Sequence, residues 1–235
     1  MNSKWQIDLF NNLNKAENLQ AVLDAALIVI KPWGFDYAGW RSSLPIPMVK
    51  RESLVFNTTE DKIIEKAKKG DYDNSPGVRH CSQSMEPVYC RGTTHEPLFF
   101  EAPELWEEYY GLGRKACWAQ SLIESSSIFS MFWVDSSSQM TLRDMDNVYF
   151  KMQWLALSVL SKMNQLKIEN NIVLSEKEKE VLRWCGDGKT VDQIGKILNV
   201  SCHDVMIYIN SAKVKLAASN TVSAVIKAIY LGLLH

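Results

Sequence analysis

Apolar residues recur every three or four positions in three segments of the first 170 residues, and this spacing predicts amphipathic helices. These segments are 5–13, 19–29 and 142–166. Short runs rich in aromatic and β-branched residues lie between the helices and predict strands. The predicted strands are 34–40, 54–56, 117–122 and 128–134. Such a mixture of helices and strands is typical of an α+β domain.

Shorter elements are expected around these segments. Thr58 or Thr59 is placed to cap a helix that runs to about Lys69, and another helix is predicted over 102–110. Residues 70–98 hold several glycines and prolines, so we expect them to be mostly irregular. The longest predicted helix has an apolar stripe that packs on the sheet in the simplest interpretation, and the same stripe permits a dimer contact.

Four short helices are predicted after residue 174, and polar residues mark where they begin. These residues are Ser175, Thr190 with Gln193, Ser201 with Asp204, and Asn220. Two short helices, a tight turn and a longer third helix form a helix-turn-helix, whose longer helix fits a DNA major groove about 12 Å wide. A small helical bundle with no role in DNA binding has the same pattern, so both interpretations stay open.

These two patterns predict two domains. We expect a mixed helix and strand domain over 1–166, a linker over 167–174 and an all-helical domain over 175–235. The 235 residues have a net charge of −1, whereas residues 171–235 hold 8 Lys or Arg and 6 Asp or Glu, a net charge of +2. This contrast has the sign expected of a C-terminal domain that meets an anion.

Composition narrows the class of protein further. Hydrophobic residues make up 46% and charged residues 23%, which is typical of folded proteins. No run approaches the ~20 apolar residues of a membrane-spanning helix, and the first residues lack a secretion signal, so we expect a cytoplasmic protein without membrane contact. The five cysteines are scattered, without paired Cys-x2-Cys spacing. We therefore expect free thiols, no metal and no cofactor, and the absence of a nucleophile with its base argues against an enzyme.

The C-terminal segment LSEKEKEVLRWCGDGKTVDQIGKILNVS (174–201) resembles the DNA-binding domain of the LuxR-type (NarL/FixJ-type) transcriptional regulators. The matching positions are Leu174, Glu178, Glu180, Val181, Leu182, Trp184, Gly188, Lys189, Thr190, Ile194, Leu198 and Ser201. The ending AIYLGLL (228–234) is also similar. The Gly-Lys-Thr sequence within this segment is not a phosphate-binding loop, because such a loop needs a glycine where Arg183 stands.

Three earlier segments are similar to the α-β-α sandwich that the quorum-sensing branch of this family uses as its sensor. They are GFDYAGWRSSLPIP (34–47), LWEEYYGLG (105–113) and FSMFWVD (129–135). The resemblance implies a pocket for a small autoinducer-like molecule. It assigns to this pocket Tyr37, Ala38, Trp40, Lys62, Lys66, Ser75, Tyr89, Gly113, Trp118 and Trp133. Each aromatic residue among them also has an ordinary interpretation as part of the core.

The chain departs from the family where acyl-homoserine lactones are bound. At the positions of the usual Trp, Tyr and Asp it has Lys62, Lys66 and Ser75. Ser75 removes a charge-assisted acceptor worth roughly 1.5–3 kcal/mol, and the lysines are expected to turn outward because burying their charge is costly. Trp133 replaces a small hydroxyl residue and is expected to fill ligand volume. We therefore expect no response to acyl-homoserine lactones.

The resemblance also places the third C-terminal helix in the DNA major groove. The candidate DNA-binding residues are Lys189, Thr190, Ser201, His203, Met206, Asn210, Ser211 and Lys213. Family members often have Thr, Lys and Arg where this chain has Asp204, Met206 and Val214. Fewer cations release fewer counterions, so weaker or altered DNA binding is expected.

These features predict a LuxR-type transcriptional regulator that binds a pseudo-palindromic operator in double-stranded DNA as a homodimer. We expect an orphan receptor, which either needs no ligand or answers to a different small molecule. The alternative is a degenerate relative that forms a heterodimer with another LuxR-type regulator and blocks it without binding DNA. A small-molecule sink is a third hypothesis.

Overall fold

The computed structural model describes residues 4–46, 53–59, 62–125, 128–168 and 172–234. The chain divides into two units, and along the C-terminal part of the sequence the division falls between Leu166 and Lys167. Within the described residues, no helix is both long enough and apolar enough to cross a membrane.

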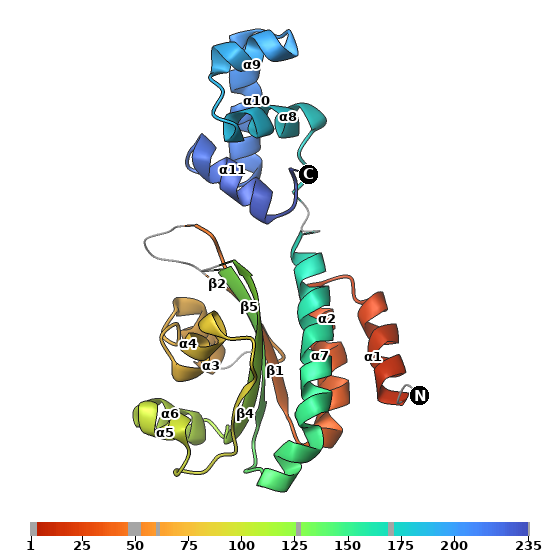
Figure 1. Ribbon diagram of the computed structural model, residues 1–235, viewed down its shortest axis with the longest axis vertical. Helices are drawn as coiled ribbons and strands as arrows, with labels where there is room; N and C mark the ends of the chain where they lie inside the picture. The colour runs from red at the N-terminus through yellow and green to blue at the C-terminus, as the bar shows by residue number, and fades with distance from the viewer. Residues whose placement is uncertain (1–3, 47–52, 60–61, 126–127, 169–171, 235) are drawn as a thin grey trace. The chain divides into compact units, whose positions relative to one another are not determined.

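An antiparallel sheet of five strands, in the order β2-β1-β5-β4-β3, forms the middle layer of the larger unit (Figure 1). The strands are β1 (Tyr37–Ser43), β2 (Ser53–Asn57), β3 (Val88–Cys90), β4 (Ala116–Ser125) and β5 (Ile128–Ser136). Side chains of successive residues point to opposite faces of a strand. The sheet therefore separates two environments, and each needs its own cover of helices.

Three helices cover one face of the sheet, and four cover the other (Figure 1). On the first face lie α1 (Lys4–Lys15), α2 (Leu19–Ile30) with the 3-10 turn Lys31–Trp33, and α7 (Leu142–Ile168). On the second face lie α3 (Lys62–Lys69), α4 (Pro76–Gln83), α5 (Pro97–Glu101) and α6 (Pro103–Gly111). The main core forms on the first face, where apolar residues of α2 and α7 pack against Ala38, Trp40 and Phe132. This α-β-α sandwich confirms the predicted fold class.

The prediction that residues 70–98 are mostly irregular missed two short elements. These residues contain α4 and β3, and Ser75 begins α4 by accepting a hydrogen bond from the Val78 N–H, with Pro76 in the first helical position. A serine followed by proline is a helix-start pattern that the abundance of glycine obscured. The predicted cap, Thr58 or Thr59, is separated from α3, which begins at Lys62, by residues 60–61, which lie outside the described residues. Thr58 itself accepts the Ala38 N–H at 3.0 Å instead.

The smaller unit holds four helices among its described residues: α8 (Glu176–Gly186), α9 (Val191–Leu198), α10 (Cys202–Lys215) and α11 (Thr221–Tyr230). The predicted starts are confirmed, because reciprocal capping boxes join Ser175 to Glu178, Thr190 to Gln193 and Ser201 to Asp204, while Asn220 caps α11. Between α9 and α10, Asn199 takes a left-handed conformation with φ of 53°. This turn lets the chain reverse within two residues.

One buried carboxylate connects α8 to α10. Glu178 Oε2 accepts from the Ser175 N–H at 2.6 Å and from Lys215 Nζ at 2.7 Å, and Oε1 accepts from the Ser211 hydroxyl at 2.6 Å. The Glu178 side chain is 4% exposed. Burial alone would raise its pKa, but the hydrogen bonds from Lys215, Ser211 and Ser175 and the charge of Lys215 lower the pKa to about 2. The ionised form therefore stabilises the fold.

Glu178→Gln is expected to lower the free energy of unfolding by about 2 kcal/mol at neutral pH, since the charge-assisted bonds are lost while Lys215 stays partly screened by solvent. A carboxyl with a lowered pKa stabilises the folded state above its ordinary pKa and loses that contribution as the pH falls through the folded value. The difference between wild type and variant should therefore shrink between about pH 5 and pH 2. Urea unfolding followed by circular dichroism measures it.

Glu176→Gln is the matched control, because Glu176 lies in the same turn, is exposed and only pairs with Lys179. It should change stability little. An equal loss in both variants, or a Glu178→Gln penalty that persists at pH 2, would contradict the assigned role.

Candidate functional site

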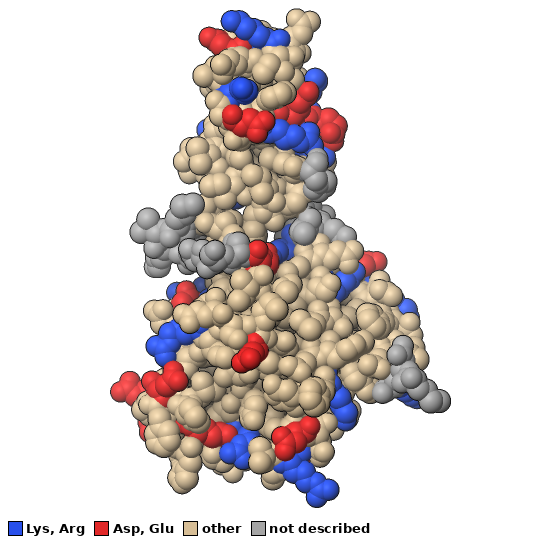
Figure 2. All heavy atoms as spheres, in the orientation of Figure 1, with Lys and Arg blue, Asp and Glu red and all other residues tan. Residues whose placement is uncertain are grey.

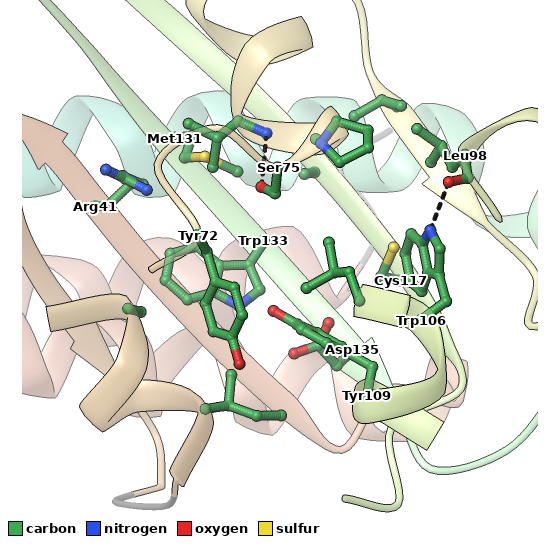
Figure 3. Close-up of a pocket in the computed structure, with 18 of the residues that line it drawn as sticks. Arg41, Tyr72, Ser75, Leu98, Trp106, Tyr109, Cys117, Met131, Trp133 and Asp135 are labelled. Atoms are coloured by element: carbon green, nitrogen blue, oxygen red, sulfur yellow. Dashed lines mark hydrogen bonds between the residues drawn. The ribbon is translucent and has the colours of Figure 1, made fainter. Parts of the chain in front are cut away.

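A cavity of about 100 Å³ lies on the second face of the sheet, under the helices α3 to α6. Figure 3 shows the side chains that converge on it from the strands and from α4 and α6. The labelled residues are Arg41, Tyr72, Ser75, Leu98, Trp106, Tyr109, Cys117, Met131, Trp133 and Asp135. Most of this wall is aromatic or aliphatic, so the cavity suits an apolar molecule.

Strand alternation explains which residues reach the cavity. On β5, Met131, Trp133 and Asp135 face it, whereas Phe132 and Val134 belong to the core on the opposite face. Trp133 stands directly across from Gly39 in the pairing of β1 with β5. A Cβ atom at position 39 would overlap the Trp133 ring. The missing side chain of Gly39 therefore lets the indole lie flat on the sheet within the cavity wall.

Two ion pairs hold charged side chains at the cavity, the first fully buried and the second buried only on the side of its arginine. Arg114 Nη1 donates to Asp135 Oδ2 at 2.5 Å, and its guanidinium lies 4.0 Å above the Tyr37 ring. Arg41 Nη2 donates to Asp73 Oδ1 at 2.6 Å. Each guanidinium neutralises the carboxylate beside it, so the cavity has charged walls without a large net charge.

The half-buried Tyr109 and Cys117 side chains stay uncharged at neutral pH. Burial raises the pKa of the Tyr109 phenol well above its ordinary value, and the charges of Asp135 and Tyr72 raise it further. Burial likewise raises the pKa of the Cys117 thiol. These groups therefore offer the cavity a neutral phenol and a neutral thiol, neither of which is an activated nucleophile.

A polar cluster at the edge of the cavity joins α3 to α6. Glu108 Oε1 accepts from Lys66 Nζ and from the Tyr72 hydroxyl, both at 2.8 Å. The hydrogen bond from Lys66 is the largest of the effects that lower the pKa of Glu108. Because Tyr72 also lines the cavity, this cluster fixes one wall from the outside.

A second candidate surface lies on α10 in the smaller unit. Val205, Ile209 and Ala212 point into the helical core, which leaves His203, Met206 and Asn210 exposed on the other side. Lys189 is exposed in the turn before α9, and Lys213 is half-buried on α10. On the face shown in Figure 2, acidic and basic side chains are interspersed over this unit. The exposed helix therefore has the shape of a DNA-reading element and only a modest positive charge.

Comparison with known proteins identifies the family of this C-terminal domain. Residues 172–228 match the family of bacterial regulatory proteins described as the luxR family. This C-terminal domain is of the LuxR type, and the chain as a whole is similar to LuxR-type transcriptional regulators.

The similarity to known regulators extends over almost the whole chain. The transcriptional activator protein AnoR of Acinetobacter nosocomialis is 27% identical over 98% of this chain and 99% of AnoR. The transcriptional activator protein SolR of Ralstonia solanacearum is 28% identical over 97% of this chain and 98% of SolR. Among solved structures, Escherichia coli SdiA superposes with a TM-score of 0.72 at 21% identity and covers 98% of both chains. The likeness to SdiA shows a shared fold, and the relatives are quorum-sensing or transcriptional regulators by name.

Of the predicted pocket residues, Ser75 and Trp133 line the cavity. The prediction was wrong for Ala38, Trp40 and Trp118, which lie in the core on the opposite face of the sheet. Each of these residues is displaced by one position along its strand from the residues that face the cavity, so its side chain points to the opposite face of the sheet. The prediction is also corrected for Tyr89, which packs against that core and contacts the Tyr149 ring at 6.2 Å.

The other predicted pocket residues do not line the cavity. Tyr37 is covered by the Arg114 guanidinium, and Gly113 is exposed in a turn with φ of 77°. Lys62 is exposed and Lys66 pairs with Glu108, as expected for lysines that turn outward. The sequence reasoning missed the cavity-facing Arg41, Tyr72, Tyr109 and Asp135. Alternation along β1 and β5 places Arg41 on the same face as Gly39, and Asp135 on the same face as Trp133, and this was the signal that could have identified them.

Three of the predicted DNA-binding hydroxyls already have structural partners. Thr190 and Ser201 cap their helices, and the Ser211 hydroxyl donates to Glu178. Caps are compatible with phosphate contact, but Ser211 is half-buried and points toward α8. Ser211 is therefore assigned to the fold of the domain, and the exposed residues of α10 stay candidates for DNA contact.

Gly39→Ala is expected to push the Trp133 ring off the sheet and to cost about 2–3 kcal/mol of stability, because the added methyl group overlaps the ring. Thermal unfolding and the indole NH resonance of Trp133 measure both effects. Gly77→Ala is the control, since nothing lies within 4 Å of a Cβ there. A Gly39→Ala protein as stable as the control, with an unchanged Trp133 resonance, would show that the ring does not depend on this glycine.

Proposed function

We propose that this regulator binds a pseudo-palindromic operator as a homodimer and does not respond to acyl-homoserine lactones. The observation that supports DNA binding most strongly is the exposed face of α10, which the capping boxes of α9 and α10 hold at the edge of the helix-turn-helix. A helix of this kind enters the major groove with its exposed side chains toward the base edges.

The side chains on α10 divide by chemistry. Asn210 offers an amide that can form two hydrogen bonds with adenine, and His203 offers a ring nitrogen near the start of the helix. Lys189 and Lys213 are placed to contact phosphates, which fix position but read no sequence. Met206 and Ile207 are 44% and 50% exposed, and they suit contact with thymine methyl groups.

A two-fold operator calls for a two-fold protein, and the larger unit has an apolar surface on α1 and α7. Phe10 stacks edge-on against Trp154 at 5.2 Å, and Leu157 lies beside them on α7. Phe150, which precedes Trp154 on α7, is 78% exposed. Exposed apolar groups that gather on two adjacent helices mark an interaction surface. We assign this surface, defined by these four residues, to contact with a second copy of the chain.

The pocket supports the proposed insensitivity to lactones. Its volume of about 100 Å³ is well below the roughly 300–1,000 Å³ of typical small-molecule sites, and the Trp133 indole lies inside it. Ser75 stands where the family has its ligand-binding carboxylate. A solved structure of SdiA is a complex with octanoyl-rac-glycerol. We propose that the pocket of this chain takes a smaller molecule or functions without one.

The alternative function is that of an antagonist, which pairs with another LuxR-type regulator and does not bind DNA itself. The exposed surface of α10 favours this alternative in one respect: Val214 is 81% exposed and apolar, where family members often have a cation. The α1 and α7 surface would serve a heterodimer equally well.

Gel shifts with family-type palindromic DNA distinguish these functions. We expect a specific complex that Asn210→Ala weakens by about 1–3 kcal/mol, mainly on the preferred sequence. Lys189→Ala should weaken binding to all sequences and reduce the salt dependence of log K by about 1. Lys15→Ala is the control, because Lys15 is exposed on α1 in the other unit. A purified protein with no specific band at low salt, together with capture of a second LuxR-type regulator, would favour the antagonist.

Thermal unfolding tests the ligand proposal. We expect N-octanoyl-homoserine lactone to leave the midpoint of the wild-type protein unchanged, whereas a ligand at 100 times its Kd adds about 2.7 kcal/mol of stability. The variant Ser75→Asp with Trp133→Ser restores the family's groups and should gain a lactone-dependent rise. Aspartate also caps helices, so α4 is preserved. A rise in the wild type of the size expected for specific binding would refute lactone insensitivity.

A further inference from the structure

Arg41 is a buried cation, and one of its N–H groups has no hydrogen-bond acceptor among the described residues. It lies on β1, is 5% exposed and lines the sensor cavity, where Figure 3 places it at one end near Met131 and Ser75. Its Nη2 donates to Asp73 Oδ1 at 2.6 Å and to Ser53 Oγ at 2.7 Å. Its Nε is buried, and no group among the described residues accepts a hydrogen bond from it.

A buried guanidinium N–H without an acceptor is costly and uncommon in folded proteins. The ion pair with Asp73 does not relieve it, because Nη2 alone makes that contact. Arg41 also faces Met131 across the β1–β5 pairing, and methionine offers only a weak acceptor. A ligand oxygen at this end of the cavity would complete the hydrogen bonding of the guanidinium.

The charge balance indicates what kind of oxygen this is. Arg41 is already neutralised by Asp73, and Asp135 by Arg114. A carboxylate ligand would add an uncompensated negative charge to a mostly apolar cavity, and burying such a charge is unfavourable. A neutral carbonyl or ether oxygen accepts the same hydrogen bond without that cost.

The size and lining of the cavity limit the rest of the molecule. Its volume of about 100 Å³ is slightly below the ~150 Å³ of an engineered apolar cavity that binds benzene. Trp133, Tyr109 and Tyr72 supply flat aromatic surfaces around it. One ring, or an apolar chain of similar bulk, is what this space accepts.

We infer that the sensor pocket binds a compact, uncharged, mostly apolar molecule whose single oxygen acceptor is recognised by Arg41 Nε. This inference rests on the proposal that the pocket serves small molecules other than acyl-homoserine lactones. Arg41 is then the residue that sets ligand polarity, and Trp133 the residue that sets ligand size.

Three probes of similar size separate these features: acetophenone, which has a neutral carbonyl, toluene, which has no acceptor, and benzoate, which is anionic. The full-length protein is labelled with ¹⁵N, and the Nε–H resonance of Arg41, assigned with Arg41→Lys, is followed during each titration. We expect acetophenone to shift this resonance and to bind about tenfold more tightly than toluene and benzoate. In Arg41→Lys, acetophenone and toluene should bind with similar affinity.

Arg79→Lys is the matched control, because Arg79 is exposed on α4 and pairs with Glu101. It should leave the preference for acetophenone unchanged. If Arg41→Lys does not fold, the wild-type preference and the shift of a protected arginine Nε–H still test the inference. Equal affinity for acetophenone and toluene in the wild type, a preference for benzoate, or a preference that survives Arg41→Lys would overturn it. Gel shifts and lactone melting on the same protein report the proposed function separately, so either can fail alone.

Discussion

The contact between the Trp133 ring and Gly39 determines what the larger unit can enclose. A five-stranded sheet sends alternate side chains to opposite faces, so the residues of β1 and β5 that face the cavity are few and fixed by register. Gly39 has no side chain to place on the cavity face, and the indole of its cross-strand partner Trp133 occupies that space. The cavity volume, the exposure of Arg41 to it and the position of Asp135 two residues along β5 all follow from that pairing.

The smaller unit depends on local polar contacts to a greater degree. Three reciprocal capping boxes within 30 residues define where α8, α9 and α10 begin. Glu178 belongs to the first of them and also reaches Ser211 and Lys215 on α10. The same carboxylate therefore begins one helix and orients another, and the orientation of the exposed face of α10 depends on a buried contact with α8.

Local patterns predicted this domain well because each of its determinants lies within a few residues of the others. The caps, the turn at Asn199 and the core positions Val205 and Ile209 could all be predicted from spacing alone. The sensor pocket could not, because its residues come together through strand register. Trp40 and Trp118 were attractive as pocket residues by type, yet each is one position from the cavity-facing set. In a sheet covered on both faces, aromatic residues occur on either side, so residue type does not reveal the face.

Ser75, Lys66 and Trp133 stand where the sequence differs from the family that it resembles, and each contacts another part of the protein. Ser75 still caps α4, as the family's aspartate would, but presents no charge to a ligand. Lys66, where the resemblance implies an aromatic residue, forms an ion pair with Glu108 that joins α3 to α6. The Trp133 ring fills space in the cavity and packs against Gly39. These side chains have partners within the protein, which supports the proposal that the larger unit packs without a lactone.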